Sequence, residues 1–433
     1  MMRCLTLTKL IASTAALTLS SALLANDMIP GKKPDAPILI TDATLYTVSS
    51  GVKQDHDLLI KDGKIAAIGQ DLTAPTNATV INGEGKHVYP GLIGLTTTVG
   101  LVEIGAVRAT RDMAETGRAT PEVKAHIAFN ADSEIIPTIR SNGITHVEVA
   151  PTGSGLNGQS SLMHLDGWNW QDALVKKGTG MHLRWPRAGI NKSFWETRTP
   201  KKQKEDNAKA LKQLSDTFEQ IKAYHKARSA NANAAIDVRW EAMRPVLDKT
   251  MPLFVHANDY RQIESAIHFA KQQDIKIVLV GVGDADKAIE LIKSNNIPVV
   301  FTSAWGHPMR SDEGLDRAYK TPAVLEQNGI SYALAINGNW NVRDLPFAAG
   351  QTVAYGVSPS TALKSVTLEP AKILGVADKM GSLEVGKQAN IVISQGDLFD
   401  HLTHKVDTVM IEGRSIDLNN RHKQLYDKYS KKN

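Results

Sequence analysis

Short apolar runs separated by turn residues follow a leader at residues 29–37 that contains proline and lysine. Runs of four or five such residues are typical of strands. The Asp62-Gly63 pair between two of them favours a tight hairpin turn. The pattern predicts a small antiparallel β module with strands at residues 38–41, 44–48, 57–60, 64–68 and 78–81.

The pattern changes between Gly91 and about Val376, where longer apolar runs alternate with stretches of helical period. Apolar strands that alternate with helices indicate parallel β/α units that are buried on both faces. The number of units favours an α/β fold of the (β/α)₈ TIM-like barrel type. The strands are expected at residues 143–150, 252–257, 276–282, 298–303 and 331–337, and the helices at 260–273, 286–295 and 322–328.

Residues 201–230 are highly charged and helical in period, and they carry a single apolar stripe. The stripe consists of Leu211, Leu214, Phe218, Ile221 and Tyr224. A stripe of this width predicts one helix with one buried face. Periodicity does not distinguish a lid over the barrel from an ordinary barrel helix with a large solvent face, and both interpretations stay open.

The N-terminus has the form of an export signal. Arg3 and Lys9 supply positive charge, and residues 10–24 contain only Leu, Ile, Ala, Ser and Thr. Small residues follow, with Ala25 at the expected cleavage point, so residues 1–25 are predicted to be a signal peptide. The alternative, a retained anchor, is disfavoured because the run is short for a membrane span. We therefore expect an exported protein, periplasmic or secreted, without a stable membrane anchor.

Composition adds limits on partners and stability. The only cysteine, Cys4, lies in the predicted signal peptide, so the mature chain depends on its core, and 42% of the residues are hydrophobic. The formal net charge is +5, with acidic and basic residues mixed along the chain. This favours a small-molecule ligand or substrate over nucleic acid as the partner. The oligomeric state is not determined by the sequence.

Three segments together resemble the amidohydrolase superfamily, in its imidazolonepropionase-like branch. They are DGKIAAIG at 62–69, VINGEGKHVYPGLI at 80–93 and TLEPAKILGVADKMGSLEVGKQAN at 367–390. The resemblance implies that both chain ends build one composite β-sandwich, residues 26–90 plus 380–433, beside a barrel of residues 91–379. It also implies a hydrolase that acts on C–N bonds of small substrates with the help of a divalent metal.

The metal-binding motif of that family is largely missing. The family continues from PGLI into Asp-x-His-x-His, whereas this chain places Thr96 and Thr98 where the two histidines belong. His256 stands at the place of the strand-five histidine, and Asn337 stands where the strand-eight aspartate would bind metal and accept a proton. A hydroxyl and an amide are poor zinc ligands, and an amide is no base near neutral pH. We expect no metal in the family's geometry.

Other residues of the chain could replace the missing ligands. His182 and His307 are candidate partners of His256 if a metal such as zinc binds, and no cofactor is predicted firmly. Arg310 accompanies His307 just after a strand, where barrel active sites form. A glycine-containing loop at residues 153–160 is a further candidate for anion binding. The pocket candidates are Thr96, Thr98, His256, His307, Arg310 and Asn337, and the sequence assigns no catalytic residue.

Three functions remain in competition at this point. The chain is either an exported C–N hydrolase with an atypical or absent metal site, or a catalytically inactive relative that binds a small ligand. A third alternative is a structural role in which the charged segment 201–230 binds a partner.

Overall fold

The computed structural model describes residues 29–231, 233–308, 310 and 313–432. The predicted signal peptide, residues 1–25, lies outside the described residues. Within the described ranges, no helix is both long and apolar enough to cross a lipid bilayer.

Strands from both ends of the chain share one eight-stranded sheet. Its order is β16-β15-β14-β5-β1-β2-β3, and β4 also pairs with β1. The N-terminal members are β1 (Ile38–Tyr46), β2 (Val52–Lys61), β3 (Lys64–Gly69), β4 (Thr79–Asn82) and β5 (His87–Pro90). The C-terminal members are β14 (Ile391–Ser394), β15 (Val406–Ile411) and β16 (Arg414–Ser415).

The junction between the two chain ends is the pair β5 and β14, which run antiparallel with Val88 opposite Ile393. A small core that includes Leu58, Ile393 and Met410 lies against this sheet. The predicted hairpin is present, because Lys61 pairs with Lys64 and both turn residues have positive φ, 52° at Asp62 and 76° at Gly63. Glycine adopts such a φ without steric cost.

A second eight-stranded sheet follows the chain in sequence from β6 to β13. Its strands are β6 (Leu92–Thr97), β7 (Ile144–Val149), β8 (Gly155–His164), β9 (Leu174–Arg184), β10 (Leu253–Ala257), β11 (Ile277–Gly281), β12 (Val299–Phe301) and β13 (Tyr332–Leu334). A parallel bridge between Thr97 and Gly338 joins the first strand to the segment after the last one. The sheet therefore closes nearly into a barrel.

The expectation of uniform β/α alternation is wrong in one part of this sheet. β8 runs antiparallel to both β7 and β9. Only residues 150–154 connect β7 to β8, and a parallel neighbour needs a crossover of about a dozen residues or more. The predicted loop at 153–160 is corrected by the same finding, since residues from Gly155 onward belong to β8.

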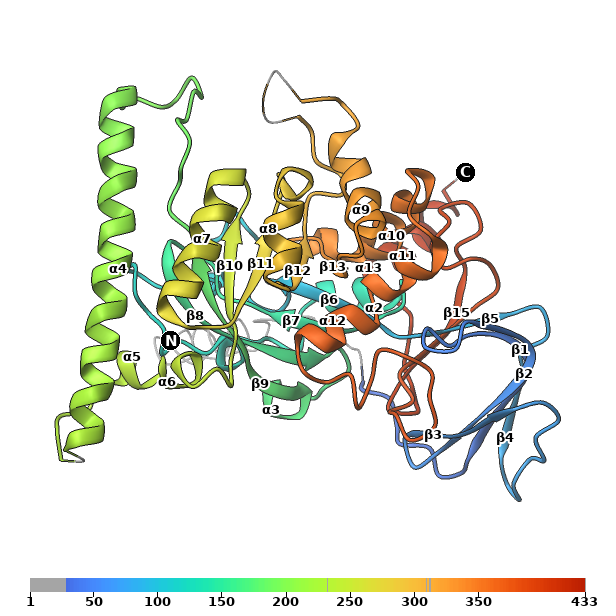
Figure 1. Cartoon of the computed structure of the whole chain (residues 1–433). Coiled ribbons are helices and arrows are strands. Elements are labelled where there is room, and N and C mark those ends of the chain that lie inside the picture. The colour runs from blue at the N-terminus through green and yellow to red at the C-terminus, as the bar shows by residue number, and fades with distance from the viewer. Residues whose placement is uncertain (1–28, 232, 309, 311–312, 433) are drawn as a thin grey trace, which may run out of the picture.

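Helices line the outside of the second sheet (Figure 1). The predicted helix at 260–273 coincides with α7 (Tyr260–Gln273), which begins at a capping box formed by Asp259 and Gln262. The remaining helices are α2 (Ile135–Arg140), α3 (Trp170–Ala173), α5 (Val238–Glu241), α6 (Arg244–Leu247), α8 (Ile289–Ser294), α9 (Arg317–Gln327), α10 (Leu345–Ala354), α11 (Pro359–Ser365), α12 (Leu368–Ile373) and α13 (Arg421–Tyr429).

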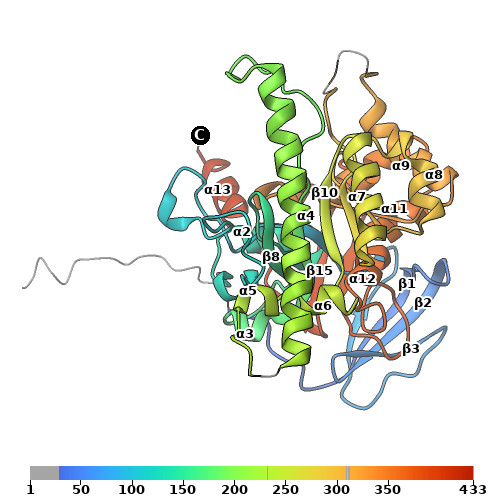
Figure 2. The same ribbon diagram turned by 60° about the vertical axis from the view of Figure 1, so that its left-hand side comes forward.

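The charged segment forms the single long helix α4 (Pro200–Ala230), capped by the Thr199 side chain. Its buried residues include Leu214, Phe218 and Ile221 of the predicted stripe. The Phe218 ring meets Phe269 of α7 edge to face, with centroids 4.9 Å apart. Figures 1 and 2 show α4 standing beside α7 on the flank of the barrel, which favours the barrel-helix interpretation over a lid.

Candidate functional site

A buried carboxylate, Glu148 on β7, lies at the centre of a polar network inside the barrel. Its Oε2 accepts a hydrogen bond from the Thr96 amide at 3.0 Å, and its Oε1 accepts one from Ser160 Oγ at 2.6 Å. Thr179 Oγ1 lies 3.4 Å from the same Oε1. Burial raises the pKa of Glu148, but the contacts with His182, Ser160 and the Thr96 amide outweigh it and leave the pKa below its ordinary value. Glu148 is therefore ionised at neutral pH.

Two imidazoles continue this network toward the end of β10. His182 Nε2 lies 3.5 Å from Glu148 Oε1, and His182 Nδ1 shares a hydrogen bond of 3.0 Å with His256 Nε2. His182 is fully buried and its ring stacks on Phe254, whereas His256 keeps part of its surface accessible. Glu148, His182 and His256 are thus linked in a row near the carboxyl ends of β7, β9 and β10. His182, one of the two candidate partners of His256 considered above, lies beside it because β9 and β10 are neighbours in the sheet.

The charge state of His256 follows from its surroundings. Burial, together with the neighbouring His182 and Arg184, holds the pKa of His256 well below its usual value. The ring is therefore neutral at neutral pH, with a lone pair on one of its nitrogens.

Thr96 and Asn337 meet at the closure of the barrel. Thr96 Oγ1 donates to Asn337 Oδ1 at 2.9 Å. A register shift between Gly94 and Thr97 inserts an extra residue in β6, and Thr96 adopts a φ of 53° there. Such a φ is an outlier for a β-branched residue and costs on the order of 1–3 kcal/mol. The bulge directs the Thr96 amide toward Glu148. The hydrogen bond between them offsets part of the backbone strain at Thr96.

The three remaining candidates, Thr98, His307 and Arg310, lie outside this network. Thr98 is buried, and its amide donates to Gly338 O at 2.8 Å. His307 and Arg310 line a cavity of about 310 Å³ beyond the ends of β10, β11 and β12. Arg310 Nη2 pairs with Asp284 Oδ1 at 2.6 Å. Burial opposes ionisation of Asp284, but Arg310, the Tyr260 amide and Arg317 lower its pKa to about 2.

His307 is exposed and makes no hydrogen bond to His182 or His256. The structure therefore brings His182 to His256, and separately brings Arg310 and His307 to one cavity wall.

The donor set does not fit the metal that the resemblance implies. A catalytic zinc takes three nitrogen, sulfur or carboxylate ligands from the protein. Glu148 faces the edge of the His182 ring opposite to the one that meets His256, so the three groups cannot converge on one ion. Val280 on β11 and Val282 just after this strand are buried apolar residues, so they offer no ligand. Across the described ranges, no group of three His, Cys, Asp or Glu side chains is arranged to hold a metal ion.

Comparison with known proteins supports the descent of the chain. The model of the amidohydrolase family matches residues 329–416. The imidazolonepropionase of Shewanella oneidensis is 23% identical over 382 residues, which covers 78% of this chain and 85% of the relative. The crystal structure of an amidohydrolase from Thermotoga maritima superposes with a TM-score of 0.77 at 26% identity, over 87% of this chain and 99% of that chain.

The chain belongs to the amidohydrolase superfamily. Its sequence relatives place it in the imidazolonepropionase-like branch. Phenylurea hydrolase B shares the fold at 15% identity, with a TM-score of 0.55 over 88% of this chain and 97% of that chain. Thr96, Thr98 and Asn337 stand at the positions where the resemblance implied metal-binding residues, and their side chains are neutral.

Several residues of the network around Glu148 could not be predicted from the sequence. Glu148 was visible only as a residue that alternates with His146 on β7, and nothing in the sequence tied it to His182. Ser160 and Thr179 reach Glu148 because β8 is antiparallel and inserted between β7 and β9. A Glu inside a strand that is expected to be buried is the one signal that could have found the site, because such a carboxylate requires partners.

Proposed function

We propose that this amidohydrolase hydrolyses a C–N bond in a small substrate without the metal of its relatives, with His256 as the general base. The observation that carries the proposal is the line Glu148–His182–His256, in which an ionised buried carboxylate supports two hydrogen-bonded imidazoles. A base oriented by a second group that is held by a third is the arrangement expected for an activated nucleophile.

The roles follow from the hydrogen bonds. With Nε2 of His256 protonated and donating to His182, Nδ1 of His256 accepts a proton from a water molecule as the water oxygen attacks the substrate carbonyl carbon. Protonated His256 is an imidazolium. His182, whose Nε2 points toward Glu148, links this imidazolium to the negative charge of Glu148, which stabilises it. The proton then passes from Nδ1 of His256 to the substrate nitrogen as the C–N bond breaks, so that the substrate and one water molecule give one carboxylic acid and one amine.

Asn337 supplies a donor for the developing oxyanion. Its Oδ1 is occupied by the Thr96 hydroxyl, which leaves the Nδ2 group for the carbonyl oxygen of the substrate. A preorganised donor of this kind contributes about 10²–10³-fold in rate.

The experiment compares compounds suggested by the names of the relatives, a cyclic imidazolone carboxylate and a phenylurea, with a simple N-acyl amino acid. We expect turnover that persists after dialysis against EDTA, with well under one zinc per chain. His256→Ala should reduce kcat by about 10²-fold or more, whereas His268→Ala, at an exposed position on α7, should not. Stoichiometric zinc, iron or manganese that survives dialysis and is required for turnover contradicts the metal-free mechanism.

Ligand binding without catalysis is the second candidate, and one observation favours it: the places of three family ligands hold neutral hydroxyl and amide groups. In that case the same compounds bind saturably, His256→Ala weakens their binding, and no product forms in any of them.

We also propose that the protein acts outside the cytoplasm, on the strength of the residue pattern before Asn26. N-terminal sequencing of the mature protein should begin at or near Asn26, and recovery of a soluble cytoplasmic pool that retains Met1 contradicts it.

A further inference from the structure

Two adjacent aromatic side chains project into solvent from the connection between β9 and α4. Phe194 and Trp195 are 95% and 67% exposed, and their rings meet edge to face with centroids 4.8 Å apart. Figures 1 and 2 show this connection rising to the end of α4 that extends beyond the barrel helices. Large apolar side chains in this position contribute nothing to the core, so the core does not explain them.

The aromatic pair occupies the two central positions of a turn, Ser193 to Glu196, here called the aromatic tip. The Glu196 amide donates to the Ser193 carbonyl at 3.0 Å, and the Ser193 amide donates to Asn191 Oδ1 at 3.0 Å. Glycine, proline, asparagine, aspartate and serine are the usual turn residues, because they adopt the required dihedral angles or bond the backbone. Phe194 and Trp195 do neither, so the turn does not explain them either.

A buried glutamine of α4 fixes the aromatic tip in place. Gln203 is 4% exposed; it accepts from the Asn191 amide at 2.7 Å and donates to the carbonyls of Asn191 and Arg198 at 3.1 Å. The Arg198 guanidinium donates to both carboxylate oxygens of Glu196, at 2.9 and 2.8 Å. The two exposed rings therefore stand on an ordered support.

The charge around the aromatic tip is mostly positive. Residues 184–206 include seven basic and three acidic residues, and one of the acids, Glu196, is paired with Arg198. Lys192, Lys201 and Lys204 are exposed, and none of them takes part in an ion pair within the described part of the chain. The helix dipole disfavours cations at the start of a helix, so the two lysines of α4 do not stabilise it.

We propose that the aromatic tip docks the protein reversibly on membranes that contain anionic lipids. Phe194 and Trp195 enter the interfacial layer, where aromatic side chains are favoured, and Lys192, Lys201 and Lys204 face the lipid phosphates. Apolar side chains beside lysines are the combination on which binding at a membrane surface depends.

The size and shape of the aromatic tip favour a membrane over a protein partner. A stable protein interface buries about 800 Å² on each partner, whereas two aromatic side chains bury about 300–500 Å² together. A projecting turn also needs a complementary pocket on a protein, while a lipid layer closes around it. Self-association through the tip is therefore an outcome that contradicts the proposal.

Co-sedimentation with vesicles tests the proposal on the unmodified protein. We expect binding to vesicles of phosphatidylcholine and phosphatidylglycerol in equal parts, and binding that is weaker by about tenfold or more to phosphatidylcholine alone, because the lysines then lack anionic partners. Added salt should weaken binding to the mixed vesicles. Equal binding to the two kinds of vesicle, or binding to neither, overturns the proposal.

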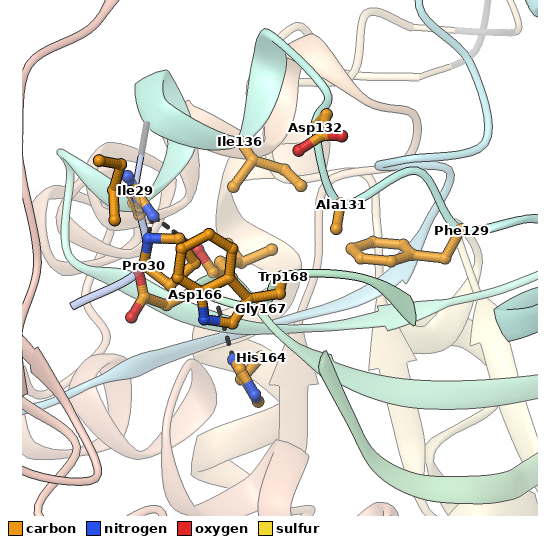
Figure 3. A pocket seen from close by; sticks show the side chains of 12 residues that line it. Ile29, Pro30, Phe129, Ala131, Asp132, Ile136, His164, Asp166, Gly167 and Trp168 are labelled. Atoms are coloured by element: carbon orange, nitrogen blue, oxygen red, sulfur yellow. Dashed lines mark hydrogen bonds and ion pairs between the residues drawn. The ribbon is translucent and has the colours of Figure 1, made fainter. Parts of the chain in front are cut away.

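A matched pair of tryptophan variants locates the contact. Trp195→Ser should weaken binding to the mixed vesicles by about tenfold, whereas Trp168→Ser should not change it. Trp168 is 64% exposed and lines a separate cavity with Pro30 and Asp166 (Figure 3). It lies next to α3, at the other end of the molecule from the aromatic tip (Figures 1 and 2). Equal loss of binding in both variants contradicts docking through the tip.

A matched pair of lysine variants tests the charge. Lys192→Ala/Lys201→Ala should weaken binding to the mixed vesicles by about tenfold, whereas Lys61→Ala/Lys64→Ala, at exposed positions of the β2–β3 hairpin, should change it little. The four side chains lie outside the core, so thermal stability should stay that of the parent. A dimer of the unmodified protein in sedimentation velocity that Trp195→Ser converts to a monomer would make the tip an interface between copies of the chain, and would overturn the proposal.

Discussion

Glu148 shows how much a single buried carboxylate determines at the residue scale. It accepts from one backbone amide and one hydroxyl and faces an imidazole, all inside the barrel. Replacement by an amide removes the negative charge and turns an NH₂ group either toward the Thr96 amide or toward the Ser160 hydroxyl and the His182 ring, in place of an acceptor. We expect Glu148→Gln to lower the free energy of unfolding by about 2–4 kcal/mol, as measured by denaturant titration.

The exposed Glu205→Gln on α4 is the matched control for this change, and it should alter stability by less than about 0.5 kcal/mol. A Glu148→Gln protein as stable as the control would show that the network contributes nothing to folding.

The buried His146 should make the free energy of unfolding depend on pH. Burial, and then the neighbouring His164 and Arg414, lower the pKa of His146 to about 3, whereas an unfolded histidine titrates near about 6.5. Between these values the unfolded chain binds a proton that the folded chain does not, so stability falls as the pH falls. The contribution amounts to about 1.4 kcal/mol per pH unit.

His146→Gln should remove that part of the slope. Between pH 6.5 and 4.5, the wild type should lose about 2–3 kcal/mol more unfolding free energy than the variant. His268→Gln, on an exposed face of α7, serves as the comparison. Equal slopes for wild type and His146→Gln would mean that the ring is not held neutral in the folded protein.

Part of the site could be predicted at the residue scale. The motif positions identified Thr96, His256 and Asn337, and the structure places Thr96 against Asn337. The link to Glu148 could not be predicted, because it depends on the bulge in β6, and an inserted residue leaves no pattern in an apolar run.

At the scale of elements, α4 depends on a narrow contact. Most of its surface is charged, and its attachment rests on the buried residues around Phe218, which meets Phe269. Phe218→Ala should cost about 3–5 kcal/mol if α4 and the barrel unfold together. We expect α4 to detach before the barrel unfolds, which limited proteolysis and hydrogen exchange would detect as selective loss of protection at residues 200–230.

Lys209→Ala, at an exposed position on the same helix, should leave the protection pattern unchanged. If α4 detaches while the thermal stability of the rest of the protein is unchanged, α4 unfolds independently of the barrel. A uniform loss of protection across the barrel would contradict this.

The helix α7 and the strands β10 and β11 were predictable because each is a regular apolar pattern between turn residues, whereas α9 begins at Arg317, five residues before the expected helix at 322–328. The range of α7 was obtained without error, and β10 and β11 lie within one residue or two of expectation. The antiparallel insertion of β8 was missed, because a strand reads the same in either direction. Only the length of the connection at residues 150–154 distinguishes the two directions.

At the scale of the whole molecule, the pair β5 and β14 joins the strands of the two chain ends in one sheet. Removal of the C-terminal strands leaves β5 without one neighbour and exposes apolar side chains of the small core, which includes Ile393 and Met410. A chain that ends at Gly381 should therefore lose the N-terminal sheet as well. We expect circular dichroism and hydrogen exchange to show residues 38–90 unprotected in the truncated protein.

The removal of α13 alone is the control, because none of the residues of that helix is buried. A cooperative unfolding transition of residues 38–90 in the protein truncated at Gly381 would show instead that the N-terminal strands form an independent domain.

The shared sheet also has a consequence for the order of synthesis. β1 to β5 leave the ribosome first, yet the strand that completes them, β14, begins only at Ile391. For most of translation the early strands present an open edge at β5. The barrel between them can acquire its strands in sequence order, whereas the sheet must wait for the last tenth of the chain. The nascent chain cannot complete its first sheet until β14 has been synthesised, so the open edge at β5 has to be shielded until then.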